Sequence, residues 1–148
     1  MSVRNNRISS LAAVAGLRGL LVLDAGGNEI SELSGLDATS SLHQLFVDNN
    51  RISALQGLEA MHELEELDLS GNPLESTELL ARLPRLQRLN LNRTGIKDLQ
   101  GVLALGDIEL LHLLDNPDLG CKSIAKAVAE YGASAIVSNL DCSLPNSD

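Results

Sequence analysis

The chain has 148 residues, of which 31 are leucine and only 1% are aromatic, so we expect one domain with an almost purely aliphatic core. Its formal net charge of −9 argues against nucleic-acid binding, which needs a basic surface, and against an electrostatic membrane anchor. It lacks a run of about 18 apolar residues, so no transmembrane helix is predicted.

The chain begins in the middle of a repeating unit. Val3, Asn6 and Ile8 form half of a pattern, L-x-x-L-x-L-x-x-N-x-I, that recurs in the segments 20–30, 42–52, 64–74, 86–96 and 108–118. Its asparagine returns with a step of 22 residues, as Asn6, Asn28, Asn50, Asn72 and Asn116, with Thr94 at the remaining step. Because no helix precedes the half repeat, we expect a bare strand edge, and bare edges pair readily. Either the chain is a fragment of a larger protein, or another subunit covers this edge, which includes self-association through it.

Each unit divides into a strand and a tight return. Alternating apolar residues such as Leu45 and Val47 indicate a short strand with one buried face. The apolar residues after it are spaced by three, which suits 3-10 turns because residues three apart eclipse. Neither half buries its apolar face alone, so neighbouring units must stack, with parallel strands on the concave side. The asparagine would satisfy backbone groups in the turn after each strand, and Thr94 would satisfy only part of them.

These residues resemble the leucine-rich repeat family over nearly the whole chain. The unit is similar to the class typified by the leucine-rich regulatory subunit of protein phosphatase 1 and an axonemal dynein light chain. The resemblance implies an α/β solenoid: a right-handed superhelix with a parallel concave sheet, 3-10 or short helical segments on the convex side, and a C-terminal capping helix. Residues 1–118 would hold the repeats, the first one partial, and residues 119–148 the cap.

The C-terminal segment departs from the 22-residue unit. The stretch 119–132, LGCKSIAKAVAEYG, predicts a helix over about 120–131, with Ile124 and Val128 on its apolar face. A last strand is expected over about 137–142, where an L-x-x-L-x-L start is partly restored. The cap would cover the open end of the stack.

Cysteine usage and the N-terminus bear on location. Cys121 and Cys142 could meet within the cap, but two cysteines do not make a disulfide framework, and we interpret them as small buried hydrophobic residues. The N-terminal sequence MSVRNNRISS is too polar for a secretory signal peptide. Together these features predict an intracellular protein, most simply cytoplasmic, and the resemblance adds association with a cytoskeleton or a flagellum.

The sequence holds no catalytic signature, so we expect no enzyme, no cofactor and no metal site. Its histidines, His43, His62 and His112, are too far apart in the repeat pattern to share a metal ion. Asp48 and Asp68 lie on adjacent strands, where paired carboxylates could perform acid–base chemistry. An open curved sheet, however, would not desolvate a carboxylate enough to tune its pKa.

Phe46 is the residue that most favours a binding surface. By register it projects from the concave face, whereas Leu45 and Val47 point to the core, and exposed aromatics are favoured interface anchors. The alternative is that Phe46 lies flat over neighbouring strand residues. Carboxylates around it would suit a partner that offers Arg or Lys about an apolar contact. The predicted partner-binding residues are Val22, Asp24, Gln44, Phe46, Asp48, Glu66, Asp68, Arg88, Asn90, Leu110 and His112.

The sequence therefore predicts a non-catalytic protein–protein interaction scaffold that binds a protein with a basic and apolar surface through its concave face. The alternative is a targeting or regulatory fragment of a larger enzyme or signalling protein, whose catalytic part lies outside this chain. The resemblance implies assembly roles, such as holding a phosphatase, a motor or a tubulin-related protein, and does not choose among them.

Overall fold

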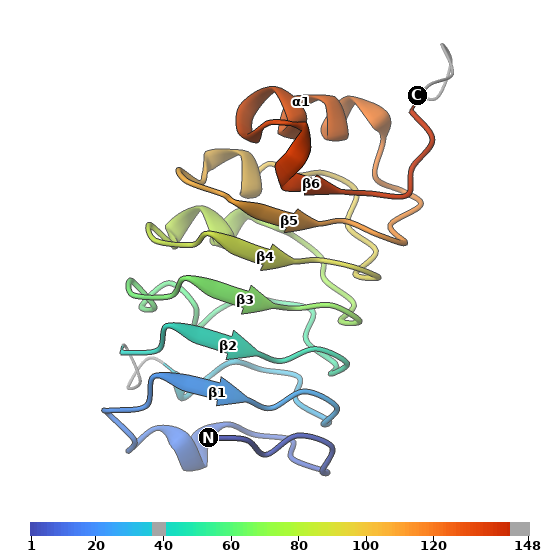
Figure 1. Ribbon diagram of the computed structural model, residues 1–148. Coiled ribbons are helices and arrows are strands. Elements are labelled where there is room, and N and C mark those ends of the chain that lie inside the picture. The colour runs from blue at the N-terminus through green and yellow to red at the C-terminus, as the bar shows by residue number, and fades with distance from the viewer. Residues whose placement is uncertain (37–40, 143–148) are drawn as a thin grey trace.

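The computed structural model describes residues 1–36 and 41–142, which form a stack of parallel strands (Figure 1). Five three-residue strands follow one another, and the two-residue β6 (Ile136–Val137) completes the sheet in chain order. Neighbouring strands pair with an offset of 22 residues as far as β5, and with an offset of 25 between β5 and β6. This confirms the predicted solenoid. Its first five strands are β1 (Val22–Asp24), β2 (Gln44–Phe46), β3 (Glu66–Asp68), β4 (Arg88–Asn90) and β5 (Leu110–His112).

Aliphatic side chains fill one slot in every repeat. Each of β1 to β5 buries its middle residue, always a leucine, and leaves the two outer residues half-exposed. The returns include the short 3-10 segments η1 (Ala12–Val14), η3 (Glu78–Arg82) and η4 (Val102–Ala104). Residues spaced by three along a return, such as Leu55 and Leu58, are also buried. The low aromatic content follows from this repeated small slot.

A ladder of buried asparagine side chains joins each turn to the preceding repeat. In Asn72, Nδ2 donates to the carbonyl oxygens of Val47 and Leu69, both at 2.9 Å. Its Oδ1 accepts a hydrogen bond of 3.0 Å from the amide of Ile52 in the preceding repeat. One side chain therefore satisfies backbone groups of two repeats. The same arrangement occurs at Asn28, Asn50 and, with other backbone partners, Asn116.

Thr94 occupies the one step of the ladder that lacks an asparagine. Its Oγ1 donates to the carbonyl oxygen of Leu91 at 2.8 Å and lies 3.1 Å from Oδ1 of Asn116. The amide of Leu74, whose counterparts bond to an asparagine side chain, instead bonds to backbone carbonyls, including that of Thr94 at 3.2 Å. Backbone carbonyl oxygens thus accept the hydrogen bond from the Leu74 amide that the side chain of Thr94 does not accept.

The chain turns out of each strand through a residue in the left-handed region. At Gly71, with a φ of 69°, a Cβ atom would lie 2.5 Å from Oδ1 of Asn49 in the preceding repeat. Glycine suits this position because it adopts a positive φ readily and has no Cβ atom to collide with Asn49. The six residues of this kind precede the ladder positions and have φ between 52° and 69°: Asn5, Gly27, Asn49, Gly71, Arg93 and Asp115.

The N-terminal half repeat adds an incomplete strand beside β1. The terminal ammonium donates to the carbonyl oxygen of Val22 at 2.8 Å, and the amide of Val3 donates to that of Asp24 at 2.8 Å. The amide of Asn5 continues the pattern with Gly26 at 2.9 Å. The first five residues therefore follow the repeat, although the bridge between Ser2 and Asp24 is isolated.

The C-terminal cap consists of α1 (Cys121–Tyr131), the 3-10 segment η5 (Ala133–Ala135) and β6. The buried residues Ile124 and Ala127 face the repeats, and the hydroxyl of Tyr131 reaches the carbonyl oxygens of Val102 and Leu105. The expected strand over about 137–142 is wrong in extent, because β6 ends at Val137. Beyond it, side chains rather than a backbone ladder attach the chain.

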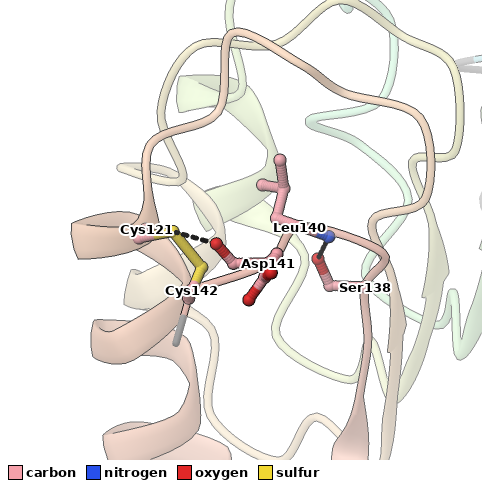
Figure 2. The surroundings of a disulfide bond; sticks show 5 residues. All are labelled: Cys121, Ser138, Leu140, Asp141 and Cys142. Atoms are coloured by element: carbon pink, nitrogen blue, oxygen red, sulfur yellow. Dashed lines mark hydrogen bonds between the residues drawn. A yellow bond between two sulfur atoms is a disulfide. The ribbon is translucent and has the colours of Figure 1, made fainter. Parts of the chain in front are cut away.

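A disulfide joins Cys121, the first residue of α1, to Cys142 (Figure 2). Cys121 is half-exposed and Cys142 is exposed. The interpretation of both as small buried hydrophobic thiols is therefore wrong. The spacing of 21 residues does not by itself predict this pairing, because the path of the chain along α1 is what brings the two sulfur atoms together.

Candidate protein-interaction surface

The outer residues of the five strands share one face of the sheet, which we call the strand face. It consists of the first and third residues of β1 to β5, all of them half-exposed. Ten of the eleven predicted partner-binding residues lie here in two rows set by the strand register. One row is Val22, Gln44, Glu66, Arg88 and Leu110, and the other is Asp24, Phe46, Asp68, Asn90 and His112.

A shallow hollow of about 110 Å³ lies on the strand face over β2 to β5. Phe46 lines one end of it, and Leu110 and His112 line the other. Polar side chains border it between these ends. The structure thus brings seven predicted residues to one place: Phe46, Glu66, Asp68, Arg88, Asn90, Leu110 and His112.

The carboxylates beside this hollow already have partners within the chain. Glu66 accepts a hydrogen bond of 2.7 Å from Nε2 of Gln44 and pairs with Arg88 at 3.3 Å. Asp68 accepts from the amide and hydroxyl of Ser70 at 2.9 and 2.6 Å, and from Nδ2 of Asn90 at 3.1 Å. These contacts fix the side chains in place, which lowers the entropy cost of ordering them when a partner binds.

Arg4 is a structural residue that the sequence-based prediction missed. Its guanidinium binds Asp48 through Nη1 and Nη2 at 2.8 and 2.6 Å, and it binds Asp24 through Nη1 at 3.0 Å. Gly26 makes this reach possible, since a Cβ there would collide with both the guanidinium and the Asp48 carboxylate. The signal was present in the sequence: Arg4, Gly26 and Asp48 occupy one repeat position in three successive units.

The Arg4 contacts set the ionisation of Asp48. Burial of this carboxylate raises its pKa, but hydrogen bonds from Arg4 and Asn49 outweigh burial and hold the pKa below its usual value. Side-chain hydrogen bonds to Asp48 and Asp24 raise the pKa of Arg4 in turn. Asp48 is 6% exposed, so it does not present a free carboxylate to a partner. Asp24 is also bound by Arg4, so two of the predicted partner-binding carboxylates have a basic partner within the chain.

The paired-carboxylate hypothesis for Asp48 and Asp68 gains no support from their contacts. Asp48 is bonded to Arg4 and Asn49, whereas Asp68 is bonded to Ser70 and Asn90. Within residues 1–36 and 41–142, no group of three or more His, Cys, Asp or Glu side chains is placed to hold a metal ion. In the same part of the chain, no helix has the length and apolar character needed to cross a membrane.

Comparison with protein families identifies the repeats. A family model described as leucine-rich repeats in two copies matches residues 40–82 and, in an overlapping register, 62–104. The two matches are offset by one 22-residue unit, which agrees with the strand register. No curated protein matches the chain in sequence.

Solved structures resemble the fold at low sequence identity. Internalin C2 from Listeria monocytogenes has a TM-score of 0.76 at 23% identity, covering 89% of this chain and 57% of its own. The internalin inlF from the same organism has a TM-score of 0.67 at 20% identity, covering 93% and 45%. A leucine-rich repeat protein from Leptospira interrogans has a TM-score of 0.66 at 20% identity, covering 91% and 41%. The chain therefore spans little more than half the length of these structures, or less.

Proposed function

Because residues 40–104 belong to the leucine-rich repeat family, we propose that the chain is a non-catalytic scaffold that recognises a partner protein through its strand face. The family and its internalin-like neighbours support a protein-interaction role in general. The hollow over β2 to β5 is the observation that favours this face. It offers an aromatic side chain at one end, within a framework whose polar groups are held in place.

The chemistry of the hollow favours a partner with an apolar side chain beside a basic one. Phe46 and Leu110 offer apolar contact area, and the stems of neighbouring polar residues extend it. Glu66 and Asp68 outnumber Arg88 among the charged groups there, so the local field attracts a cation even though each carboxylate has an internal partner. A half-buried aromatic surrounded by fixed polar groups is the usual setting of an interface hot spot.

The test compares two apolar truncations in a defined complex. A partner is first captured with the wild-type chain, identified by mass spectrometry and purified, and its affinity is then measured by calorimetry. Phe46→Ala should weaken binding about 5- to 150-fold, equivalent to roughly 1–3 kcal/mol, with little change in thermal unfolding. Leu17→Ala is the matched control, because Leu17 is 42% exposed and lies outside the strand face. Unchanged affinity in Phe46→Ala, or an equal loss in both variants, would contradict the proposal.

A further inference from the structure

The asparagine ladder ends before the last turn of the solenoid. Between β5 and β6 the register is offset by 25 residues, pairing Leu111 with Ile136 and His112 with Val137. Carried past the end of β6, the same offset would place Asp141 at the position that corresponds to Asn116 (116 + 25 = 141). A carboxylate has no N–H to donate to strand carbonyls, as Nδ2 of each ladder asparagine does. An aspartate there could accept hydrogen bonds from amides, but it could not bind strand carbonyl oxygens as the ladder asparagines do.

Non-covalent contacts of this turn with the repeats include those of β6, Asn139 and Leu140. β6 contributes two residues, and its Val137 carbonyl accepts a 2.8 Å hydrogen bond from the amide of Leu113. Asn139 exchanges two hydrogen bonds with Asp115, at 3.0 and 2.8 Å, both on the exposed surface. Leu140 adds a partly buried contact with the core. The backbone pairing of this turn with β5 thus ends at Val137.

The disulfide lies beyond the end of β6, in the last described turn of the chain. Cys142 follows Asp141, and its bond to Cys121 ties the last turn to the start of α1, with the two Cα atoms 5.4 Å apart (Figure 2). Ile124 and Ala127 anchor α1 in the core, and the Tyr131 hydroxyl anchors its C-terminal end. The covalent bond therefore connects a weakly attached turn to a well-packed helix.

We propose that the Cys121–Cys142 disulfide is a redox-sensitive latch that holds the C-terminal edge closed in place of a ladder asparagine. A dithiol reductant can reach it, because Cys142 is exposed and Cys121 half-exposed. Two electrons and two protons convert the Sγ–Sγ bond into two thiols, and the dithiol becomes a disulfide. Reduction releases residues 138–142 and loosens β6, while repeats farther along the solenoid, which contact only their neighbours, keep their structure. A latch that is normally closed requires a compartment where disulfides persist, so the proposal differs from the intracellular location expected from the sequence.

Hydrogen exchange on the purified chain tests the latch. Mass spectrometry should first show the oxidised protein two mass units lighter than the reduced one. With dithiothreitol, peptides covering 133–142 should exchange at least tenfold faster, whereas peptides covering 44–90 should be unchanged. The melting temperature should fall by roughly 5–10 °C, as expected for opening a loop of this length in a chain of this size. Equal exchange with and without reductant, or a uniform increase along the chain, would overturn the proposal.

Variants separate the latch from the other attachments of the turn. The double substitution Cys121→Ser and Cys142→Ser should match the reduced protein and lose its response to dithiothreitol. Asn139→Ala, which removes the two hydrogen bonds to Asp115 and keeps the disulfide, is the control and should change exchange over 133–142 much less. In cells of the source organism, acid quenching and alkylation should find the disulfide formed. Two free thiols there would overturn the proposal.

Discussion

At the scale of single residues, Arg4 connects three repeats that the backbone joins only in pairs. It pairs with an almost buried carboxylate, Asp48, two units away, across the space that Gly26 leaves open. A carboxylate with that little exposure is costly to leave without a cation or donor. Arg4 itself is 40% exposed, so solvent screening reduces what the pair contributes.

Removing Arg4 should destabilise the protein in a pH-dependent way. Arg4→Met should lower the free energy of unfolding by about 1–3 kcal/mol at pH 7, because it leaves Asp48 buried with fewer donors. The folded-state pKa of Asp48 is lowered, so its stabilising contribution is fully present above the ordinary value of about 3.9 and is lost as the pH falls below it. Urea unfolding at pH 7 and pH 3 should therefore show the unfolding free energies of the two proteins converging in acid.

Arg51→Met is the control, since the Arg51–Glu29 pair is exposed and is expected to contribute about 0.5 kcal/mol or less. Equal losses in the two variants, or a gap independent of pH, would contradict this account.

At the scale of the repeat element, the ladder side chains differ in how many backbone groups they satisfy. Asn72→Ala should cost roughly 2–4 kcal/mol, because buried groups of two repeats lose their partners together. Thr94→Ala is the matched comparison and should cost about 1 kcal/mol, since Leu74 already bonds to backbone carbonyls there. Denaturant unfolding of both variants measures the difference. A cost for Thr94→Ala that equals that of Asn72→Ala would show that the backbone does not compensate at this step.

The repeat elements were predictable from the sequence because their signal is local and periodic. Alternation placed Leu45 in the core and Phe46 on the strand face, and the 22-residue step set the strand register. Contacts between units were harder to foresee, since they depend on how far a side chain reaches across the stack. Arg4 reaches past one unit, and the disulfide depends on the path of α1, where the 22-residue period no longer applies. The extent of β6 was mispredicted for the same reason.

At the scale of the whole stack, the first and the last described units are held differently. The first unit contacts β1 through a few strand hydrogen bonds and through Arg4. The last unit is covered by α1 and carries the disulfide. In such a solenoid each repeat is stabilised by its neighbours, so an end unit with one neighbour opens at a lower free-energy cost than an inner one.

This asymmetry predicts the order in which the oxidised protein opens. In the isolated 148-residue chain, amides of the first unit, including Val3 and Asn5, should exchange at least tenfold faster than those of β3 and β4, because in that chain the first unit has one stacked neighbour. The 11-residue helix α1 should give 119–131 intermediate protection at the opposite end. Native-state hydrogen exchange followed by peptide mass spectrometry measures all three regions in one experiment.

Arg4→Met should speed exchange in the first unit further and leave exchange in β4 unchanged, which distinguishes fraying of the first unit from unfolding of the whole chain. Uniform exchange from the first unit to β4 would mean that the stack opens as one cooperative unit, and the one-dimensional description would then fail.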